Sequence, residues 1–286
     1  MEKIVLGVDI GGSHITAALI DLEKKKEISK TRFRARLNAH ASAAEIIGAW
    51  ALTIENAMGR YAGMPAWISI AMPGPMDYKN GICLIKDQDK YESLYKVNIK
   101  EKLAQRLNFP AAKISFRNDA VCFLQGEIFS GSIKGLDKAI GLTLGTGLGT
   151  AHMIDGKAFD SDLWKMPFLK GIAEDYISTR WFVTRFEELA EVKIKDVKDL
   201  VENHRDSPYF RSIFIEFSMN LAKFIYKFVR KKMPLAAVIG GNIAQAEAFF
   251  LDDTRKYLAQ MMGYSFPIKR STLGEKATLI GAGSCL

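Results

Sequence analysis

The sequence predicts an α/β protein made of two related halves. Residues 6–21, LGVDIGGSHITAALID, and residues 140–155, IGLTLGTGLGTAHMID, share one pattern: an apolar run, a small-residue turn, a second apolar run and an aspartate. Aligned without a gap, Gly7 falls on Gly141. After each copy, strand-like and helix-like segments alternate, which is typical of α/β folds. No low-complexity linker separates the halves, so we expect them to meet across a cleft.

The first half is expected to open with a β-hairpin. Residues 4–10 form an apolar run, and apolar residues alternate again after two glycines, at Ile15, Ala17 and Leu19. This alternation indicates strands with one buried face. The charged segment over residues 22–36 continues toward a third antiparallel strand.

Helices and strands alternate through the rest of this half. Periodicity and turn residues predict a helix over 43–57, a strand over 66–71, a helix over 99–108, a strand over 114–116 and a helix over 121–128. The first of these strands ends in MPGP, where Pro73, Gly74 and Pro75 impose a turn.

The second half repeats this order from a strand over 139–144. A long helix is expected over residues 208–232, because large apolar residues recur at spacings of three and four and Pro234 stops the pattern. These apolar residues are Phe214, Phe217, Leu221, Phe224 and Phe228. Residues 236–242 then predict a strand that runs into a turn, and the following IAQAEAFF is expected to begin a helix.

Size and composition indicate an ordinary globular protein. The chain has 286 residues, of which 48% are hydrophobic and 25% charged, enough for one large or two moderate domains. An acidic residue at position 2 and Asp9 inside the first apolar run exclude the apolar core of a signal peptide. No later apolar stretch approaches the roughly 18 residues of a membrane span. We therefore expect a soluble, cytoplasmic protein without a membrane partner.

Charge and cysteine content argue against two further classes. The net charge is +8, yet the lysines are scattered, so we expect a solvated surface that favours anionic substrates and no nucleic-acid partner. Cys83, Cys122 and Cys285 are widely spaced and form no CxxC pair. This argues against a disulfide framework and against a cysteine-rich zinc site, and predicts reduced, mostly buried thiols.

Neither glycine turn is a common nucleotide motif. No GK[ST] follows, which excludes a Walker A loop, and the second turn leads into a strand, which excludes a Rossmann fingerprint. Small residues still let backbone N–H groups approach phosphate oxygens closely. One such turn is more often only a tight turn, but two in register predict phosphate binding.

Two aspartates are candidates for the chemistry. Asp9 lies in an apolar strand just before the first turn, where an unpaired carboxylate is costly. Its partner would be a metal-bound water of Mg²⁺–ATP, or else a nearby lysine or the amides of the turn itself. Asp119, in FRNDA, follows a strand and precedes a helix, so it is either an N-cap or a general base that takes a proton from a substrate hydroxyl.

Several motifs in order resemble the ROK family of sugar kinases, within the actin, hexokinase and heat-shock chaperone superfamily. They are VDIGGSHITAALID, AMPGPMD, RNDA, LGTGLGT, VIGGN and the closing LIGAGSCL, so the resemblance covers essentially the whole chain. It implies a two-lobed actin-like ATPase (ribonuclease H-like) fold, in which each lobe is a mixed sheet with flanking helices. The lobes expected are residues 1–118, joined by a C-terminal helix over 276–286, and residues 119–275.

The resemblance also implies roles for individual residues. Residues at the ATP phosphates and adenosine are Asp9, Gly11, Gly12, Ser13, Thr143, Gly145, Thr146, Gly147, Gly240, Gly241 and Asn242. Residues at the sugar are Gly74, Asn118, Asp119, Asp162, Lys165 and Glu174. Asp119 is the implied catalytic base, and Asp9 is implied to hold Mg²⁺ through water.

One segment departs from the family pattern. Where the family has Glu-x-Gly-His, this chain has Asp162, Leu163, Trp164 and Lys165, and Glu174 aligns with the last glutamate of a zinc motif whose cysteines are all missing. The zinc site is therefore expected to be absent as a unit. Lys165 is either a sugar donor or an exposed lysine beside Trp164. Glu174 is either a sugar ligand or an acid in the first turn of a helix.

The predicted function is transfer of the γ-phosphoryl group of ATP to a hexose hydroxyl, at the 6-position of glucose or a related hexose. The alternatives are a kinase-like protein that binds or senses sugar or nucleotide without turnover, and a repressor. Repressors of the family carry a helix-turn-helix ahead of the kinase-like body, whereas here the first strand begins at Ile4. The identity of the sugar and the choice of ATP or polyphosphate as donor stay open. A homodimer also stays open, since Phe182 and Phe186 could form either a partner surface or part of the internal packing.

Overall fold

The computed structural model describes residues 3–88 and 90–285. The chain divides into two compact units. Unit 1 contains the residues up to Ser130 together with those from Glu275 onward, and unit 2 is Gly131–Gly274. The lobe boundary predicted after residue 118 differs from this division, in which the whole helix that begins at Asp119 belongs to unit 1.

Unit 1 is built on one mixed sheet. Its strands are β1 (Ile4–Ile10), β2 (His14–Asp21), β3 (Lys26–Glu27), β4 (Phe33–Arg36), β5 (Ile68–Ala71) and β8 (Ile114–Arg117). The order is β3-β2-β1-β5-β8, with β4 also paired to β2. β1 and β2 form the expected antiparallel hairpin, and β5 and β8 continue the sheet in parallel with β1.

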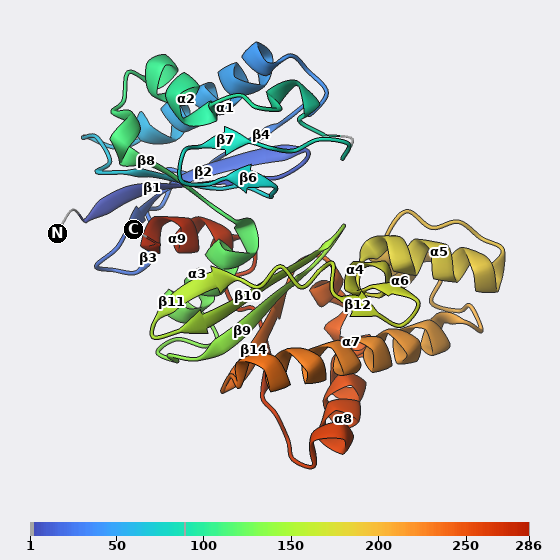
Figure 1. The fold of residues 1–286 in the computed structure, drawn as a ribbon. Helices are drawn as coiled ribbons and strands as arrows, with labels where there is room; N and C mark the ends of the chain where they lie inside the picture. The colour runs from blue at the N-terminus through green and yellow to red at the C-terminus, as the bar shows by residue number, and fades with distance from the viewer. Residues whose placement is uncertain (1–2, 89, 286) are drawn as a thin grey trace. The chain divides into compact units, whose positions relative to one another are not determined.

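Helices cover this sheet. They are α1 (Ala43–Met58) and α2 (Ile99–Leu107), with a buried core of Ile, Leu, Val and Trp50 between them and the strands (Figure 1). Ser42 and Glu45 form a capping box that fixes the start of α1. The sequence analysis left out four short elements, which are β6 (Met76–Asp77), β7 (Ile82–Cys83) and the 3-10 helices η1 (Glu92–Leu94) and η2 (Ala111–Lys113).

Two helices of unit 1 pack closely against each other. They are α3 (Asp119–Ser130) and α9 (Lys276–Ser284). A Cβ atom on Gly281 would lie 1.6 Å from the carbonyl oxygen of Cys122, and one on Gly126 would lie 2.0 Å from that of Ala277. Only glycine permits this approach, which explains why α3 groups with the C-terminal helix. The predicted C-terminal helix ends at Ser284, and its last expected residue lies outside the described residues.

Unit 2 repeats the sheet of unit 1. Its strands are β9 (Ala139–Leu144), β10 (Leu148–Ile154), β11 (Lys157–Asp160), β14 (Ala236–Gly240) and β15 (Ile268–Arg270). The order β11-β10-β9-β14-β15 again places an antiparallel hairpin beside two strands that run parallel to its first strand. The duplication predicted from the two glycine turns is therefore confirmed at the level of topology.

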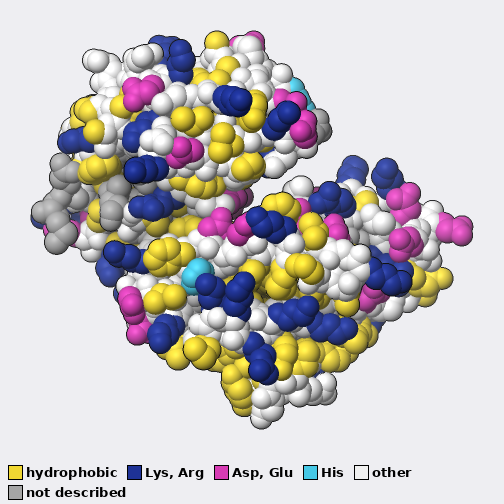
Figure 2. Space-filling view, viewed as in Figure 1, with side chains coloured by type: hydrophobic (Ala, Val, Ile, Leu, Met, Phe, Trp, Pro, Cys, Tyr) yellow, Lys and Arg dark blue, Asp and Glu magenta, His cyan; other side chains and the backbone are white. Residues whose placement is uncertain are grey.

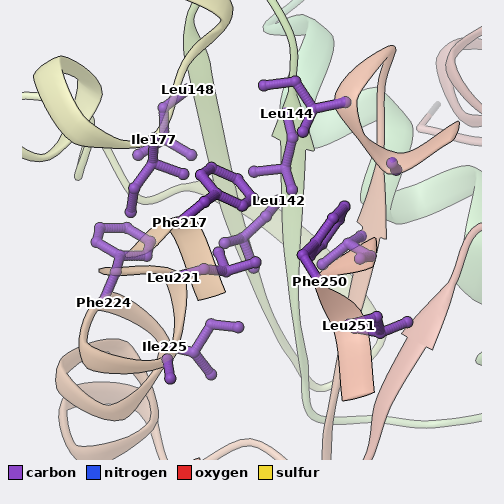
Figure 3. Close-up of a cluster of buried hydrophobic side chains, with 14 of the residues drawn as sticks. Leu142, Leu144, Leu148, Ile177, Phe217, Leu221, Phe224, Ile225, Phe250 and Leu251 are labelled. Carbon is purple, nitrogen blue, oxygen red and sulfur yellow. The ribbon is translucent and has the colours of Figure 1, made fainter. Parts of the chain in front are cut away.

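The core of unit 2 is rich in aromatic residues. All five predicted apolar positions of α7 (Phe210–Lys232) are fully buried, and Leu142, Leu144 and Leu148 of the hairpin belong to the same cluster (Figure 3). Phe182 and Phe186 are buried there too, so internal packing accounts for both. The homodimer therefore stays a prediction from the resemblance alone.

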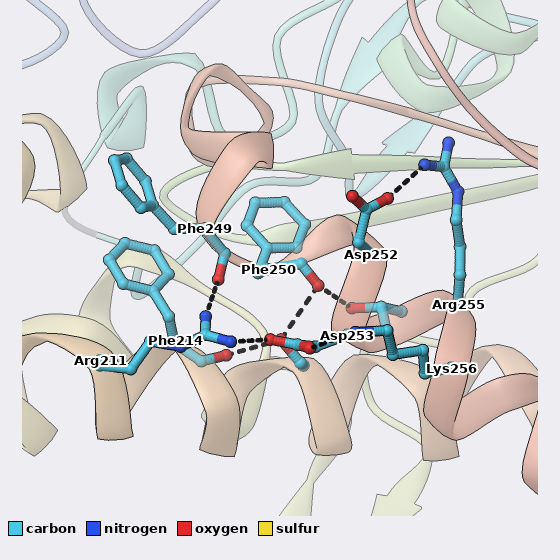
Figure 4. Close-up of polar contacts among 10 residues, drawn as sticks. Arg211, Phe214, Phe249, Phe250, Asp252, Asp253, Arg255 and Lys256 are labelled. Atoms are coloured by element: carbon cyan, nitrogen blue, oxygen red, sulfur yellow. Dashed lines mark hydrogen bonds and ion pairs between the residues drawn. The ribbon is translucent and has the colours of Figure 1, made fainter.

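Polar contacts join α7 to α8 (Leu251–Met262) (Figure 4). Arg211 donates to the Asp253 carboxylate and to the Phe249 carbonyl, and the Ser218 hydroxyl donates to the Phe250 carbonyl at 3.0 Å. The segment before α8, predicted to begin a helix, is a 3-10 helix, η3 (Ile243–Phe249), with a break at Ala246. Elements of unit 2 that were not predicted include β12 (Pro167–Phe168), β13 (Gly171–Ile172), α4 (Ala173–Tyr176), α5 (Thr179–Ala190) and α6 (Val197–Asn203).

Two global properties match the composition. No described helix has the length and apolar character needed to cross a membrane. Lys and Arg side chains are spread over the face drawn in Figure 2, between acidic and apolar side chains. The scatter of basic residues along the sequence thus persists on the surface.

Candidate active site

The first glycine turn closes the β1–β2 hairpin of unit 1. The Gly11 amide donates to the His14 carbonyl at 2.9 Å, and the buried Tyr91 hydroxyl donates to the Gly11 carbonyl. Burial raises the pKa of Tyr91, which keeps its hydroxyl a donor. A cavity of about 200 Å³ lies at this turn. It is lined by Asp9, Gly11, Ser13, His14, Thr16, Arg32, Arg34 and Glu275.

Asp9 faces this cavity without a bonded partner. Among residues 3–88 and 90–285, no hydrogen bond or ion pair reaches its carboxylate. Arg34 lies on β4, opposite Thr16 of β2, and forms an ion pair with Glu275 at 2.8 Å and not with Asp9. The lysine and turn-amide partners considered from the sequence are thus not used by Asp9 in the described part of the chain.

The surroundings of Asp9 disfavour its charged form. The pKa of Asp9 is raised from 3.8 to about 7, and burial is the largest cause. The carboxylates of Asp119 and Glu275 add to the increase, while the guanidinium of Arg34 opposes it. A carboxylate in this state is suited to an incoming cation that supplies the missing positive charge.

Asn118 and Asp119 lie where β8 passes into α3. The Asn118 Oδ1 atom accepts from the Ala120 and Val121 amides at 2.9 and 3.2 Å, so Asn118 caps the helix. The alternative that Asp119 is the N-cap is therefore wrong. Asp119 is the first residue of the helix, and its charge acts on Asp9 in the same unit.

Tyr78 joins the predicted sugar residues of unit 1, and the sequence analysis missed it. Its hydroxyl donates to the Met72 carbonyl at 3.1 Å and accepts from Asn118 Nδ2 at 3.4 Å. A Cβ on Gly74 would lie 3.2 Å from the same hydroxyl. The only signal in the sequence is an aromatic residue shortly after the MPGP turn.

The second glycine turn closes the β9–β10 hairpin of unit 2, just as the first turn closes the β1–β2 hairpin of unit 1. Leu144 and Leu148, on either side of the turn, are anchored in the buried core (Figure 3). Thr143 pairs with Gly240 at the carboxyl ends of the parallel strands β9 and β14. Gly241 has a φ of +89°, and a Cβ there would lie 2.3 Å from the Leu144 carbonyl oxygen. The structure thus brings together Thr143, Gly145, Thr146, Gly147, Gly240, Gly241 and Asn242.

Glu174 belongs to the surroundings of this turn. Its Oε2 atom accepts from the Leu148 amide at 2.9 Å, and its Oε1 atom accepts from Arg180 at 3.2 Å. Thr179 donates to the Gly145 carbonyl through its amide at 2.8 Å and its hydroxyl at 3.0 Å. Thr179 and Arg180 were not predicted as site residues. Glu174 lies in the first turn of a short helix, as its structural alternative predicted.

Asp162 and Lys165 pair with each other. Their side chains form an ion pair and are both about half exposed. The Lys165 ammonium lies 5.9 Å from the centre of the Trp164 ring, as its structural alternative predicted. In the described part of the chain, no group of three or more His, Cys, Asp and Glu side chains is placed to hold a metal ion.

Comparison with known families decides the relationship. A sequence model described as "ROK family" matches residues 5–161, more than half of the chain. The chain belongs to the ROK family. The predicted family and fold class are thereby confirmed, because solved ROK proteins share the fold over nearly the full length of this chain.

Individual ROK relatives are distant. A glucokinase of Thermotoga maritima is 29% identical over 54% of this chain and 46% of its own length. An N-acetyl-D-glucosamine kinase of Vibrio cholerae is 22% identical over 85% of this chain and 86% of its own. The crystal structure of a ROK family glucokinase from Streptomyces griseus, in complex with glucose and AMPPNP, has a TM-score of 0.77 at 23% identity and covers 98% of both chains. This ROK chain therefore spans less than half of the Thermotoga enzyme that it matches.

Proposed function

We propose that this ROK chain is an ATP-dependent sugar kinase that transfers the γ-phosphoryl group to a hydroxyl of a hexose, at the 6-position of glucose or a related hexose. The observation that carries the proposal is the arrangement in unit 1 of two carboxylates with different roles. Asp9 is a buried acid without a bonded partner beside a glycine turn, and Asp119 begins α3. Phosphoryl transfer needs one group that manages cationic charge at the phosphates and one that receives the hydroxyl proton.

The donor phosphates are assigned to the glycine turns. Gly11, Gly12 and Ser13 in the first turn, and Gly145, Thr146 and Gly147 in the second, have small side chains that let phosphate oxygens approach the backbone. The Gly11 and Gly145 amides donate within their own turns, so the amides that follow them are the proposed donors to phosphate. Thr143 supports the second turn, and Gly240, Gly241 and Asn242 are assigned to adenosine. The two turns occupy equivalent positions in two sheets of the same topology, which supports this assignment.

The chemistry around Asp9 fits a hydrated magnesium ion. The carboxylate is unpartnered among the described residues and faces a cavity of about 200 Å³. Asp9 would hold the ion through bound water, and the ion would neutralise phosphate charge. Asp9 itself supplies the negative charge that attracts the ion and keeps the cavity polar.

The acceptor sugar is assigned to Asn118 and Asp119. Asp119 takes the proton from the attacking hydroxyl as the phosphoryl group arrives, and Asn118 orients a hydroxyl through its amide. Tyr78 contacts Asn118 and fixes its amide group, and Gly74 leaves room beside it. Asp162 and Lys165 remain the proposed sugar contacts of unit 2, without a zinc site, whereas the Glu174 carboxylate accepts from the Leu148 amide of the second turn. The names of the relatives support a hexose or an N-acetylated amino sugar as acceptor. We also propose a cytoplasmic location, where ATP is supplied.

A second candidate function is binding or sensing of sugar or nucleotide without turnover. The observation that favours it is the ion pair between Asp162 and Lys165, which occupies both side chains that replace the family's sugar ligands. Asn118, Asp119 and both glycine turns are retained, however, and a protein without catalysis has no need of the base. We therefore place the kinase first.

The test measures ADP release from Mg²⁺–ATP with a panel of hexoses, amino sugars and N-acetyl sugars, with Asp119→Asn as the blank. The same panel is repeated with polyphosphate, read as sugar phosphate formed. A sugar-dependent signal that disappears in the variant supports the kinase and names its acceptor. Tight ATP binding without a signal from any sugar favours the second candidate.

A further inference from the structure

The segment that contains α4 and the start of α5 is hydrogen-bonded to both ends of the second glycine turn. At one end, the Glu174 carboxylate accepts from the Leu148 amide at 2.9 Å. At the other end, Thr179 donates twice to the Gly145 carbonyl, at 2.8 and 3.0 Å. The first turn has a hydroxyl donor at the equivalent carbonyl, Tyr91 on Gly11. Of the two glycine turns, only the second has a carboxylate that accepts from a backbone amide within the described residues.

This segment is firmly anchored in unit 2. Ile177 lies between Glu174 and Thr179 in the sequence and is fully buried in the same cluster as Leu148 (Figure 3). Ser178 is also buried, and its hydroxyl accepts from the Trp181 amide to cap α5. A carboxylate on such a fixed segment can determine where the turn amide points.

Two features make the position of the carboxylate specific. A Cβ on Gly147 would lie 2.5 Å from Glu174 Oε2, so a larger residue at this position would require the carboxylate to move. The Arg180 guanidinium donates to the other oxygen at 3.2 Å. Glu174 is mostly buried at 21% exposure, while Arg180 is 68% exposed. A lone carboxylate beside a phosphate site would repel the ligand, and the arginine offsets that charge.

We propose that Glu174, oriented by Arg180, is a positioning residue of the second glycine turn, so that its carboxylate serves the donor phosphates and not the sugar. The inference rests on the proposed function, because it takes the turn as a phosphate site. It revises the role that the resemblance implies for Glu174. Loss of a hydrogen bond to a charged group typically costs about tenfold in an equilibrium. Glu174→Ala is therefore expected to raise the KM for ATP by about tenfold and to leave the KM for sugar unchanged.

The kinetic test compares Glu174→Ala, Glu174→Gln and a matched control. Glutamine keeps an acceptor for the Leu148 amide, so it is expected to restore most of the affinity for ATP that alanine loses. The control is Glu187→Gln, which removes an exposed acid from α5. A higher KM for sugar in Glu174→Ala, with the KM for ATP unchanged, would overturn the proposal, and so would wild-type values of both constants.

A second measurement does not depend on turnover. Hydrogen exchange of peptides that span residues 144–150 is followed in the full chain without ligand, for wild type and the same variants. Exchange is expected to be faster in Glu174→Ala than in wild type or Glu187→Gln, because the Leu148 amide has lost its acceptor. Equal exchange contradicts the positioning role. If the wild type shows no sugar-dependent ADP release, the proposed function fails while the exchange result still decides the role of Glu174.

Discussion

Replacement of Asp9 by asparagine is expected to stabilise the ligand-free protein at pH 8. The carboxylate is buried beside the carboxylates of Asp119 and Glu275, and its pKa is raised from 3.8 to about 7. A change of that size corresponds to roughly 4 kcal/mol between the charged and the neutral group. Asparagine keeps the shape and removes the charge, so this amount is the upper bound of the gain in unfolding free energy.

The gain should depend on pH in a defined direction. The pKa of Asp9 is higher in the folded than in the unfolded protein, so between about pH 4 and pH 7 the folded protein retains a proton that the unfolded chain releases. The contribution of Asp9 to stability is therefore present at low pH and lost as pH rises through this range. Asparagine does not titrate, so the difference between variant and wild type is near zero at pH 4 and largest at pH 8.

Urea unfolding followed by circular dichroism at pH 4.5 and pH 8 tests this expectation. Asp21→Asn is the matched control on the same hairpin, because the pKa of Asp21 is lowered by the backbone amide of Lys24 and should give no gain at pH 8. An Asp9→Asn variant that is less stable than wild type at pH 8 would refute the reasoning, since it would mean that the charged form of Asp9 is well compensated in the folded protein. The same variant is expected to lose affinity for Mg²⁺–ATP.

Three further predictions follow from unit 1. Asp119→Asn should lower sugar-dependent turnover by about 10²–10⁴-fold with ATP affinity within a few fold, and steady-state rates near wild type would remove Asp119 from the mechanism. Asn118→Ala removes the acceptor at the start of α3 and should lower the unfolding free energy by about 1 kcal/mol in urea, an effect whose absence would contradict the cap. Gly281→Ala places a methyl group 1.6 Å from the Cys122 carbonyl oxygen, so calorimetry should show destabilisation by about 1–3 kcal/mol, and an unchanged Tm would argue against the close packing of α3 and α9.

The parts of the fold that are encoded locally were predictable from the sequence. The two hairpins follow from alternation around glycine turns, and α7 follows from the spacing of its phenylalanines, because a local period reports which face of an element is buried. The duplication also required only self-comparison. Short elements such as β12, β13 and α4 escaped because two to four residues carry no period.

The contacts within the candidate site were less predictable. Glu174 reaches Leu148, and Tyr78 reaches Asn118, across many intervening residues, so their pairing depends on tertiary packing that no local pattern contains. The N-cap alternative for Asp119 lay one residue too late, since Asn118 and Asp119 are both good caps and only the geometry distinguishes them. The buried state of Asp9 was predictable from its apolar strand, but its isolation from Arg34 was not, because Glu275 comes from the other end of the chain.

The most direct test of the account is ³¹P NMR of the protein with Mg²⁺–ATP and the sugar that gives the strongest ADP release. If the chain is a sugar kinase, a new sugar phosphate resonance grows in step with ADP, is split by the two protons of a 6-methylene group, and is absent with Asp119→Asn. Growth of inorganic phosphate alone, or no change in the ATP signals, would contradict the assignment of this chain as a sugar kinase.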